Sequence, residues 1–235
     1  MRVARWRSDR RSPPDSTPDA PESAQARQKR RFERTTDSHH VWPVAPGLLD
    51  QEFTAAGPDE TRAADISSIR TKEGWLYLAV VIDLFARREV GWSTRDQLYH
   101  ALALAALRDA VVPHRPAAGL IHHADHGVQF AARRDRKRLQ QHGMLCSMSR
   151  KGDRWDNAPM ESLHATLKGE FVEQHDCLTR DEARAGIVQF LEGWYNRRGL
   201  HSALGRLTAK QKAAAFHAAA SAAWNALRGS GERPR

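Results

Sequence analysis

The chain has 235 residues, of which 40% are hydrophobic and 28% charged, and its formal net charge is +9. This composition excludes a wholly disordered chain, a collagen-like repeat and a coiled coil. The longest apolar run, at 75–82, is too short to span a bilayer, which takes about 20 residues, and no apolar segment follows the N-terminal arginines as in a secretory signal.

Charge and proline content divide the chain. Residues 1–36 hold ten basic and five acidic residues and four prolines, with almost no large apolar side chain. Such a segment cannot bury enough surface to offset its ordering entropy, so we expect a disordered basic arm. It is either a solvated tail or a DNA-contacting arm. An ordered pattern runs through residues 37–205, and residues 206–235 read as an alanine-rich helix with a frayed tail.

The ordered part alternates apolar strand-like runs with amphipathic, helix-like segments. In chain order the pattern predicts strands at 63–69, 75–82 and 88–93, a helix at 96–112, a strand at 120–123, a helix at 128–142, a strand at 144–148 and helices from about 157, at 180–196 and at 208–227. Three strands followed by strand–helix alternation predict an α/β fold, with helices on the faces of a mixed sheet.

Three acidic residues, in or near the predicted strands and the helix that follows them, are candidates for a catalytic or metal-binding role. Asp65 lies in the first predicted strand, Asp125 follows the fourth, and Glu161 lies one turn into the helix after it, on a flank shared with Lys168. Carboxylates gathered at one point repel one another unless a cation lies between them, and carboxylate oxygens suit Mg²⁺ or Mn²⁺. For each acid alone, a surface turn or a helix cap is the plainer interpretation, and spacing does not decide between the two.

Sequence motifs favour the chemical role over a turn or a cap. They are distributed from about residue 31 to residue 214. They are ADIS (64–67), YLAVVIDLFARR (77–88), HHADHGVQF (122–130), MSRKGDRWDNAPMES (148–162), WYNRR (194–198) and HSALG (201–205). With these motifs, and with 35 residues between Asp125 and Glu161, the chain resembles the transposases of bacterial insertion sequences that carry a retroviral-integrase-like catalytic core of the DDE type.

The resemblance implies an RNase H-like fold, that is, a mixed five-stranded sheet flanked by helices, with extra C-terminal helices after it. It also implies that Asp65, Asp125 and Glu161 are the catalytic and metal-binding triad, and that they hold two Mg²⁺ or Mn²⁺ ions. The expected function is metal-dependent DNA strand cleavage and strand transfer. The expected partners are DNA, as element ends and target, and further copies of the chain in a homo-oligomer on DNA, without a membrane. The expected location is the cytoplasm, in association with the nucleoid.

Basic residues near these motifs are candidate contacts to DNA phosphates, with a solvated basic surface as the alternative for each. They are Arg150, Lys151, Arg154, Lys168, Arg197, Arg198 and His201. His122 and His123 are candidate metal ligands, but adjacent strand residues point to opposite faces, so we expect one of them to be packed. Asp83 also matches a family position. We expect it to lie outside the triad and to order the turn that follows it.

The chain also departs from the family pattern. Arg62 stands where tryptophan is usual, and residues 1–30 lack the amphipathic pattern of the helix-turn-helix region that full-length relatives carry. We therefore expect an N-terminally truncated copy. The alternatives are an inactive remnant that only binds DNA or co-assembles with an intact transposase, and a general RNase H-like nuclease. The intact triad favours the transposase over the remnant, and the Asp125–Glu161 spacing favours it over the nuclease.

Overall fold

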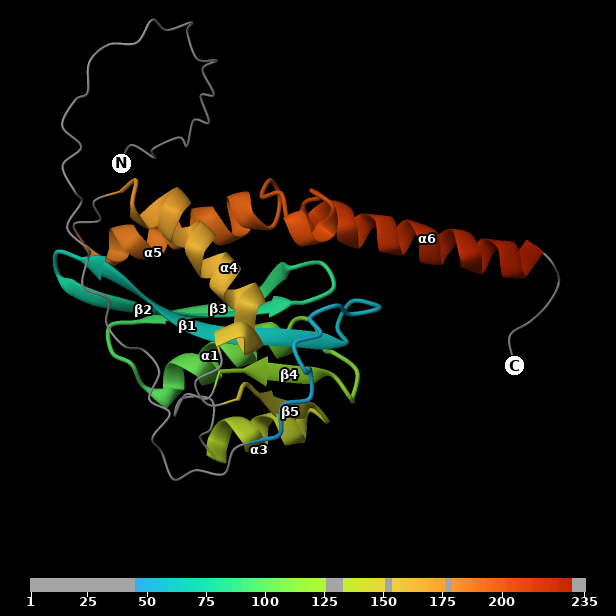
Figure 1. The fold of residues 1–235 in the computed structure, drawn as a ribbon, viewed down its shortest axis with the longest axis horizontal. Coiled ribbons are helices and arrows are strands. Elements are labelled where there is room, and N and C mark those ends of the chain that lie inside the picture. Colours follow the sequence, from blue (N-terminus) through green and yellow to red (C-terminus); the bar gives the residue numbers. More distant parts are fainter. Residues whose placement is uncertain (1–44, 126–132, 151–153, 176–178, 230–235) are drawn as a thin grey trace, which may run out of the picture. The chain divides into compact units, whose positions relative to one another are not determined.

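The computed structural model describes residues 45–125, 133–150, 154–175 and 179–229, which all belong to one compact unit of the chain. At its centre is a five-stranded sheet of order β3-β2-β1-β4-β5 (Figure 1). The strands are β1 (Thr61–Thr71), β2 (Gly74–Asp83), β3 (Arg88–Arg95), β4 (Ile121–Ala124) and β5 (Leu145–Met148). The first three pair in antiparallel fashion, and β4 is parallel to both β1 and β5, so the predicted mixed sheet is confirmed.

The helices fall where the apolar pattern predicts them, with small shifts of their ends. They are α1 (His100–Val111), α3 (Arg133–Gln141), α4 (Ala158–Leu167), α5 (Arg180–Val188) and α6 (Ala209–Gly229), with short 3-10 segments at Arg154–Asn157 and Ser202–Leu204 and π-helical continuations at Lys168–Val172 and Gln189–Tyr195. Helix α1 begins four residues later than predicted, because Tyr99 keeps an extended backbone with φ −113° and ψ 157°. The first five residues of the helix predicted at 128–142 lie outside the described residues.

Each face of the sheet has its own core. In β2 the even-numbered residues Leu76, Leu78 and Val80 face one core, while the odd-numbered Tyr77 and Ala79 face the other. Helices α4 and α5 cover the first face, and α1 covers the second (Figure 1). A strand buried on both faces reads as a continuous apolar run, which is why β2 is the plainest strand in the sequence.

Two glycines are required by the geometry of the antiparallel strands, one in the β1–β2 turn and one beneath α1. The β1–β2 hairpin turns between Thr71 and Gly74, where Gly74 has φ +114° and the Thr71 hydroxyl donates to the Gly74 carbonyl at 2.8 Å. At β3, Gly91 lies so close to α1 that an added Cβ would come within 2.4 Å of the Ala110 nitrogen. Glycine at 91 is therefore what lets α1 lie directly on the sheet.

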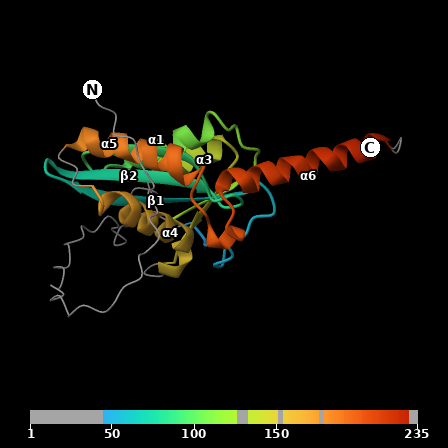
Figure 2. The ribbon, with the colours of Figure 1, turned by 90° about the horizontal axis from the view of Figure 1, so that it is seen from above.

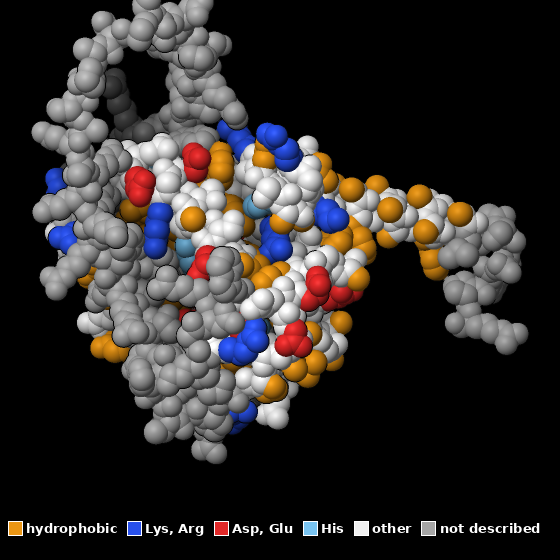
Figure 3. All heavy atoms as spheres, viewed as in Figure 1, with side chains coloured by type: hydrophobic (Ala, Val, Ile, Leu, Met, Phe, Trp, Pro, Cys, Tyr) orange, Lys and Arg blue, Asp and Glu red, His pale blue; other side chains and the backbone are white. Residues whose placement is uncertain are grey.

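Helix α6 touches the core near its first turns. Phe216 packs edge-on against Phe85 with ring centroids 5.0 Å apart, and the Lys212 ammonium lies 4.7 Å from the centre of the same Phe85 ring. In Figures 1 and 2 the later turns of α6 have no other described element beside them, and its surface in Figure 3 is largely apolar. Nowhere in the described residues is there a helix with the length and apolar character needed to cross a membrane.

Candidate active site

Strand pairing brings two of the predicted acids to neighbouring positions. Strands β1 and β4 are parallel, with Ala64 opposite Ala124, and Asp65 and Asp125 are the residues that follow this pair. Ala63, two residues before Asp65, belongs to the core under α4 and α5. Because strand residues alternate between faces, Asp65 lies on that same face. The sheet therefore sets both aspartates at adjoining strand positions under α4.

Helix α4 carries the third acid and is held against β1 at two points. The Asn157 side-chain amide, just before the helix, donates to the Ala64 carbonyl at 3.4 Å, and His164 Nε2 lies 3.4 Å from Asp65 Oδ2. Residues 157, 161 and 164 are spaced to share one helix face. Glu161 therefore lies on the flank of α4 that is turned toward β1, while Met160, Leu163 and Leu167 fill the core.

Asp65 and Asp125 come from paired strands, and Glu161 comes from α4, which contacts β1 through Asn157. The Asp65 side chain is 19% exposed and its Oδ1 accepts from the Ile66 amide at 2.7 Å, whereas Glu161 is exposed. Within the described residues, no group of three histidine, cysteine, aspartate or glutamate side chains is arranged to hold a metal ion. The donors themselves suit a hard cation, because they are carboxylate oxygens that are partly open to water.

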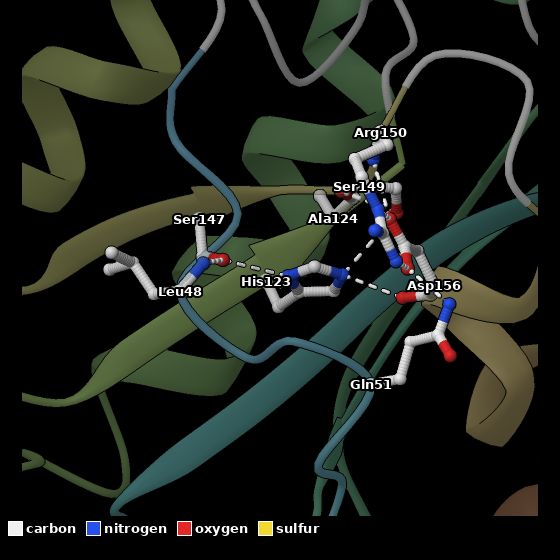
Figure 4. A network of polar contacts seen from close by, with 8 residues as sticks. All are labelled: Leu48, Gln51, His123, Ala124, Ser147, Ser149, Arg150 and Asp156. Carbon is white, nitrogen blue, oxygen red and sulfur yellow. Dashed lines mark hydrogen bonds and ion pairs between the residues drawn. The ribbon is translucent and has the colours of Figure 1, made fainter.

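Beside these acids, His123 joins β4 and β5 to the start of α4 (Figure 4). Its Nε2 lies 2.8 Å from the Asp156 carbonyl oxygen and its Nδ1 lies 2.8 Å from the Ser147 hydroxyl. A carbonyl only accepts, so Nε2 carries the proton, and Nδ1 of the neutral ring accepts from Ser147. Burial lowers the pKa of His123 and keeps it neutral. With both nitrogens engaged, His123 is a structural link between strand and helix.

The Asp156 carboxylate organises the segment that leads into α4. It accepts from the Arg150 backbone amide and guanidinium at 2.7–3.0 Å, and from the Gln51 side-chain amide at 3.1 Å (Figure 4). These hydrogen bonds, with that from Arg150 first among them, hold the pKa of Asp156 well below its ordinary value. Arg150 thus already has an acidic partner, while its side chain is still 60% exposed. Its contact to a DNA phosphate stays a prediction.

His122 points to the opposite face, as strand alternation predicts. It pairs across the sheet with Arg62, is fully buried, and has a pKa lowered to about 3 by burial and by the nearby Arg62 charge. Arg62 itself has no exposed surface, donates to the Ala110 carbonyl at 2.7 Å and pairs with Asp59. The arginine that replaces the family's usual tryptophan therefore ties β1 to α1.

Asp83 orders the β2–β3 turn, as expected. Its carboxylate accepts from the Asp59 amide at 2.9 Å and from the Ala86 amide at 3.1 Å, while burial raises its pKa. Arg87, in this turn, has φ +54° and donates to the Phe53 carbonyl at 3.2 Å. The turn thus presents a half-buried guanidinium on the side of the sheet where α4 lies.

The remaining predicted DNA contacts fall into three groups. Arg197 and Arg198 are exposed, and Lys168 is half-buried on the π-helical turn after α4. His201 packs edge-on against Tyr195, and burial, together with the Arg87 charge, lowers its pKa, so the ring is neutral at pH 7. Any contact from His201 to a phosphate would therefore be made by a neutral ring rather than by a cation. Lys151 and the Arg154 side chain lie outside the described residues.

Sequence reasoning missed the contacts that hold α4 in place. His164, which is three residues after Glu161, and Asn157, which is four before it, carry a helical-spacing signal, because both fall on the face of Glu161. Both nitrogens of His164 are buried without a hydrogen-bond partner in the structure. Ser147 had no such signal, because its partner His123 is on another strand.

Comparison with known proteins shows the family to which the chain belongs. Residues 55–154 and 142–208 each match a family described as "Integrase core domain". The insertion element IS600 31 kDa protein of Shigella sonnei is 43% identical over 182 residues, which make up 77% of this chain and 67% of that protein. The chain belongs to the insertion-sequence transposase family with an integrase-type core. Transposase InsF for insertion sequence IS3A of Escherichia coli (strain K12) is 38% identical over 79% of this chain, which spans 65% of InsF.

Solved structures agree on the fold of this transposase-family chain. A chain of the simian T-cell lymphotropic virus intasome, in complex with the PP2A regulatory subunit B56 gamma, superposes with a TM-score of 0.56 at 14% identity over 77% of this chain and 61% of its own. The HTLV-2 integrase catalytic core domain in complex with magnesium, in its trimeric form, gives 0.50 at 13% identity over 67% of this chain and 97% of its own. The RNase H-like fold of integrase cores is therefore confirmed.

Proposed function

We propose that this chain is the catalytic core of a DNA transposase, which cuts DNA strands and joins them to a target, with Asp65, Asp125 and Glu161 as its metal-binding acids. The observation that carries the proposal is the pairing of Ala64 with Ala124, which puts Asp65 and Asp125 at neighbouring strand positions beneath the Glu161 helix. The chain belongs to the transposase family, and the resemblance to that family implies that these three acids bind metal ions.

The metal we propose is Mg²⁺ or Mn²⁺, held by the three carboxylates. The HTLV-2 integrase core, which shares the fold, is a magnesium complex. A pair of such ions activates an attacking water or 3′-hydroxyl and stabilises the leaving oxygen in phosphoryl transfer. The chain's own residues would bind the metal ions and orient the acids that hold them. His164 lies beside Asp65, with Nε2 3.4 Å from Oδ2, and the start of α4 is fixed by Asn157 and by the His123–Asp156 link.

DNA is the proposed substrate, bound through its phosphates by the predicted cations. Arg197 and Arg198 are exposed, and Lys168 lies two turns after Glu161 on the same flank. Neutralised phosphates release counterions, so binding should weaken steeply with salt. We also propose that more than one copy acts together on DNA, because the integrase core with this fold is named in a trimeric form.

The test compares Asp125→Asn with Asp96→Asn, an exposed acid outside the site. Saturating Mg²⁺ or Mn²⁺ should raise the melting temperature of the unmodified protein by about 5 °C, because an ion that binds only the folded state stabilises it by mass action. Asp96→Asn should keep this gain and Asp125→Asn should lose it, with its melting temperature in EDTA unchanged. Cleavage of a labelled duplex in Mn²⁺ should fail in Glu161→Gln. Equal metal-induced shifts in all three proteins would show that the acids are misassigned.

A further inference from the structure

A groove of about 420 Å³ opens along the flank of α4 that carries Ser162 and Thr166. One wall is α4, through Pro159, Ser162 and Thr166, and the other is the segment 194–203. Ser162 directly follows Glu161 in the chain, so the groove lies on the helix face that adjoins the face carrying Glu161. A volume of this size is that of a small-molecule site and cannot admit a duplex.

The groove holds a cation suited to a phosphate. Arg87 lines it, and burial lowers the pKa of its guanidinium without removing the charge. Among the described residues, its hydrogen-bond acceptor is the Phe53 carbonyl at 3.2 Å, and it forms no ion pair with a carboxylate there. A guanidinium has five N–H donors, so most of them are available to an anion in the groove.

The other walls are aromatic and apolar. Phe53, Trp194, Tyr195 and the neutral His201 all line the groove, and His201 Nε2 is buried without a hydrogen-bond partner. Leu200, also in the lining, is 58% exposed. Aromatic faces stack bases of any sequence, and exposed apolar side chains are used as wedges that separate stacked bases.

We propose that this groove binds one unstacked nucleotide of a DNA strand, with its phosphate on Arg87 and its base against the aromatic wall. The proposal rests on the proposed function, because it assigns the substrate form that the acids act upon: a strand opened beside the phosphate that reacts. Enzymes that must reach an atom inside a duplex take a nucleotide out of the stack. The combination of one cation, several rings and a cavity too small for a duplex fits a single nucleotide.

The test is fluorescence anisotropy with a labelled 12-nucleotide oligothymidylate and with the same oligonucleotide carrying abasic sites at its four central positions. The unmodified protein should bind the intact oligonucleotide about 5- to 150-fold more tightly, because base stacking on aromatic side chains contributes on the order of 1–3 kcal/mol. Ala203→Leu fills the groove from an exposed position and should remove this preference while leaving the abasic affinity unchanged. Ala222→Leu, on the exposed surface of α6, is the matched control and should behave as the unmodified protein.

A second variant tests the phosphate. Arg87→Gln should weaken binding to both oligonucleotides and lower the salt slope by about 0.7, the value for one phosphate contact on a single strand. Equal affinity for intact and abasic DNA in the unmodified protein would overturn the base site while leaving the proposed function standing. Binding to neither DNA would overturn both. If Ala203→Leu instead lowers the mass in sedimentation, the groove is a contact between copies and the nucleotide proposal is wrong.

Discussion

The two faces of the central sheet are built in different ways. Beneath α1 the packing is close and made of small residues: Gly91 lies against Ala110, and Ala103 and Ala106 are buried there. Beneath α4 and α5 the core is made of larger side chains, and the polar contacts of the candidate site, such as His164 with Asp65, lie at its edge. Close packing holds α1 on its face of the sheet, whereas hydrogen bonds position the start of α4 beside the candidate site on the other face.

This difference in packing predicts that the two faces respond differently to substitution. A helix packed on alanine and glycine can approach the backbone closely, and such an interface tolerates little change in volume. Hydrogen bonds such as His123 to Asp156 hold a helix start in one direction relative to a strand end. We therefore expect changes on the α1 face to affect stability alone, and changes at the α4 edge to affect stability together with metal binding.

The largest effect is expected on the α1 face. Gly91→Ala would place a Cβ 2.4 Å from the Ala110 nitrogen and 2.6 Å from the Ala106 oxygen, which are backbone atoms that cannot rotate away. We expect a loss of about 3 kcal/mol or more in urea unfolding, because the helix must move off the sheet. Gly193→Ala is the matched control: an added Cβ there meets nothing within 4 Å, and alanine should stabilise the helical segment by about 0.5–1 kcal/mol. A neutral Gly91→Ala would contradict the close approach.

At the α4 edge, His123→Ala should cost about 2 kcal/mol in the free energy of unfolding. It leaves the buried Ser147 hydroxyl and the Asp156 carbonyl without their partner and creates a cavity. It should also reduce the melting-temperature gain in Mg²⁺ or Mn²⁺, because the start of α4 would no longer be held beside the aspartates. His142→Ala, at an exposed position, should change neither quantity. If His123→Ala loses stability but keeps the full metal response, the link does not position the site.

The third expected effect sharpens the comparison because it depends on pH. Glu89 is buried at the start of β3, and burial, followed by the charges of Asp109 and Glu192, raises its pKa to about 7. A carboxyl whose folded pKa is raised favours folding below its unfolded pKa and loses that contribution as pH rises to about 7. Glu89→Gln should therefore equal the unmodified protein near pH 4 and exceed it by about 3 kcal/mol at pH 8.5 in urea unfolding. Glu173→Gln, at an exposed glutamate, should show no such trend, and a pH-independent difference for Glu89→Gln would contradict the shift.

Some of the candidate site was predictable because its signals are local. The apolar stripe of Met160, Leu163 and Leu167 follows from helical spacing, and all three are buried under the sheet. The opposite orientations of His122 and His123 follow from strand alternation. The metal-binding role of Asp65, Asp125 and Glu161 stays a prediction from resemblance. The partners of His123, by contrast, lie 24 and 33 residues away along the chain, and no periodic pattern connects residues so far apart.

The sequence by itself determined the kind and position of nearly every element, because strand and helix periodicities are properties of neighbouring residues. It also determined the transposase family, through motifs that are contiguous in the chain. Only the tertiary structure decided the strand order β3-β2-β1-β4-β5, the burial of Arg62 against α1, and the groove between α4 and residues 194–203. Each of these depends on which distant segments pair and pack, and that choice is made by the whole core at once.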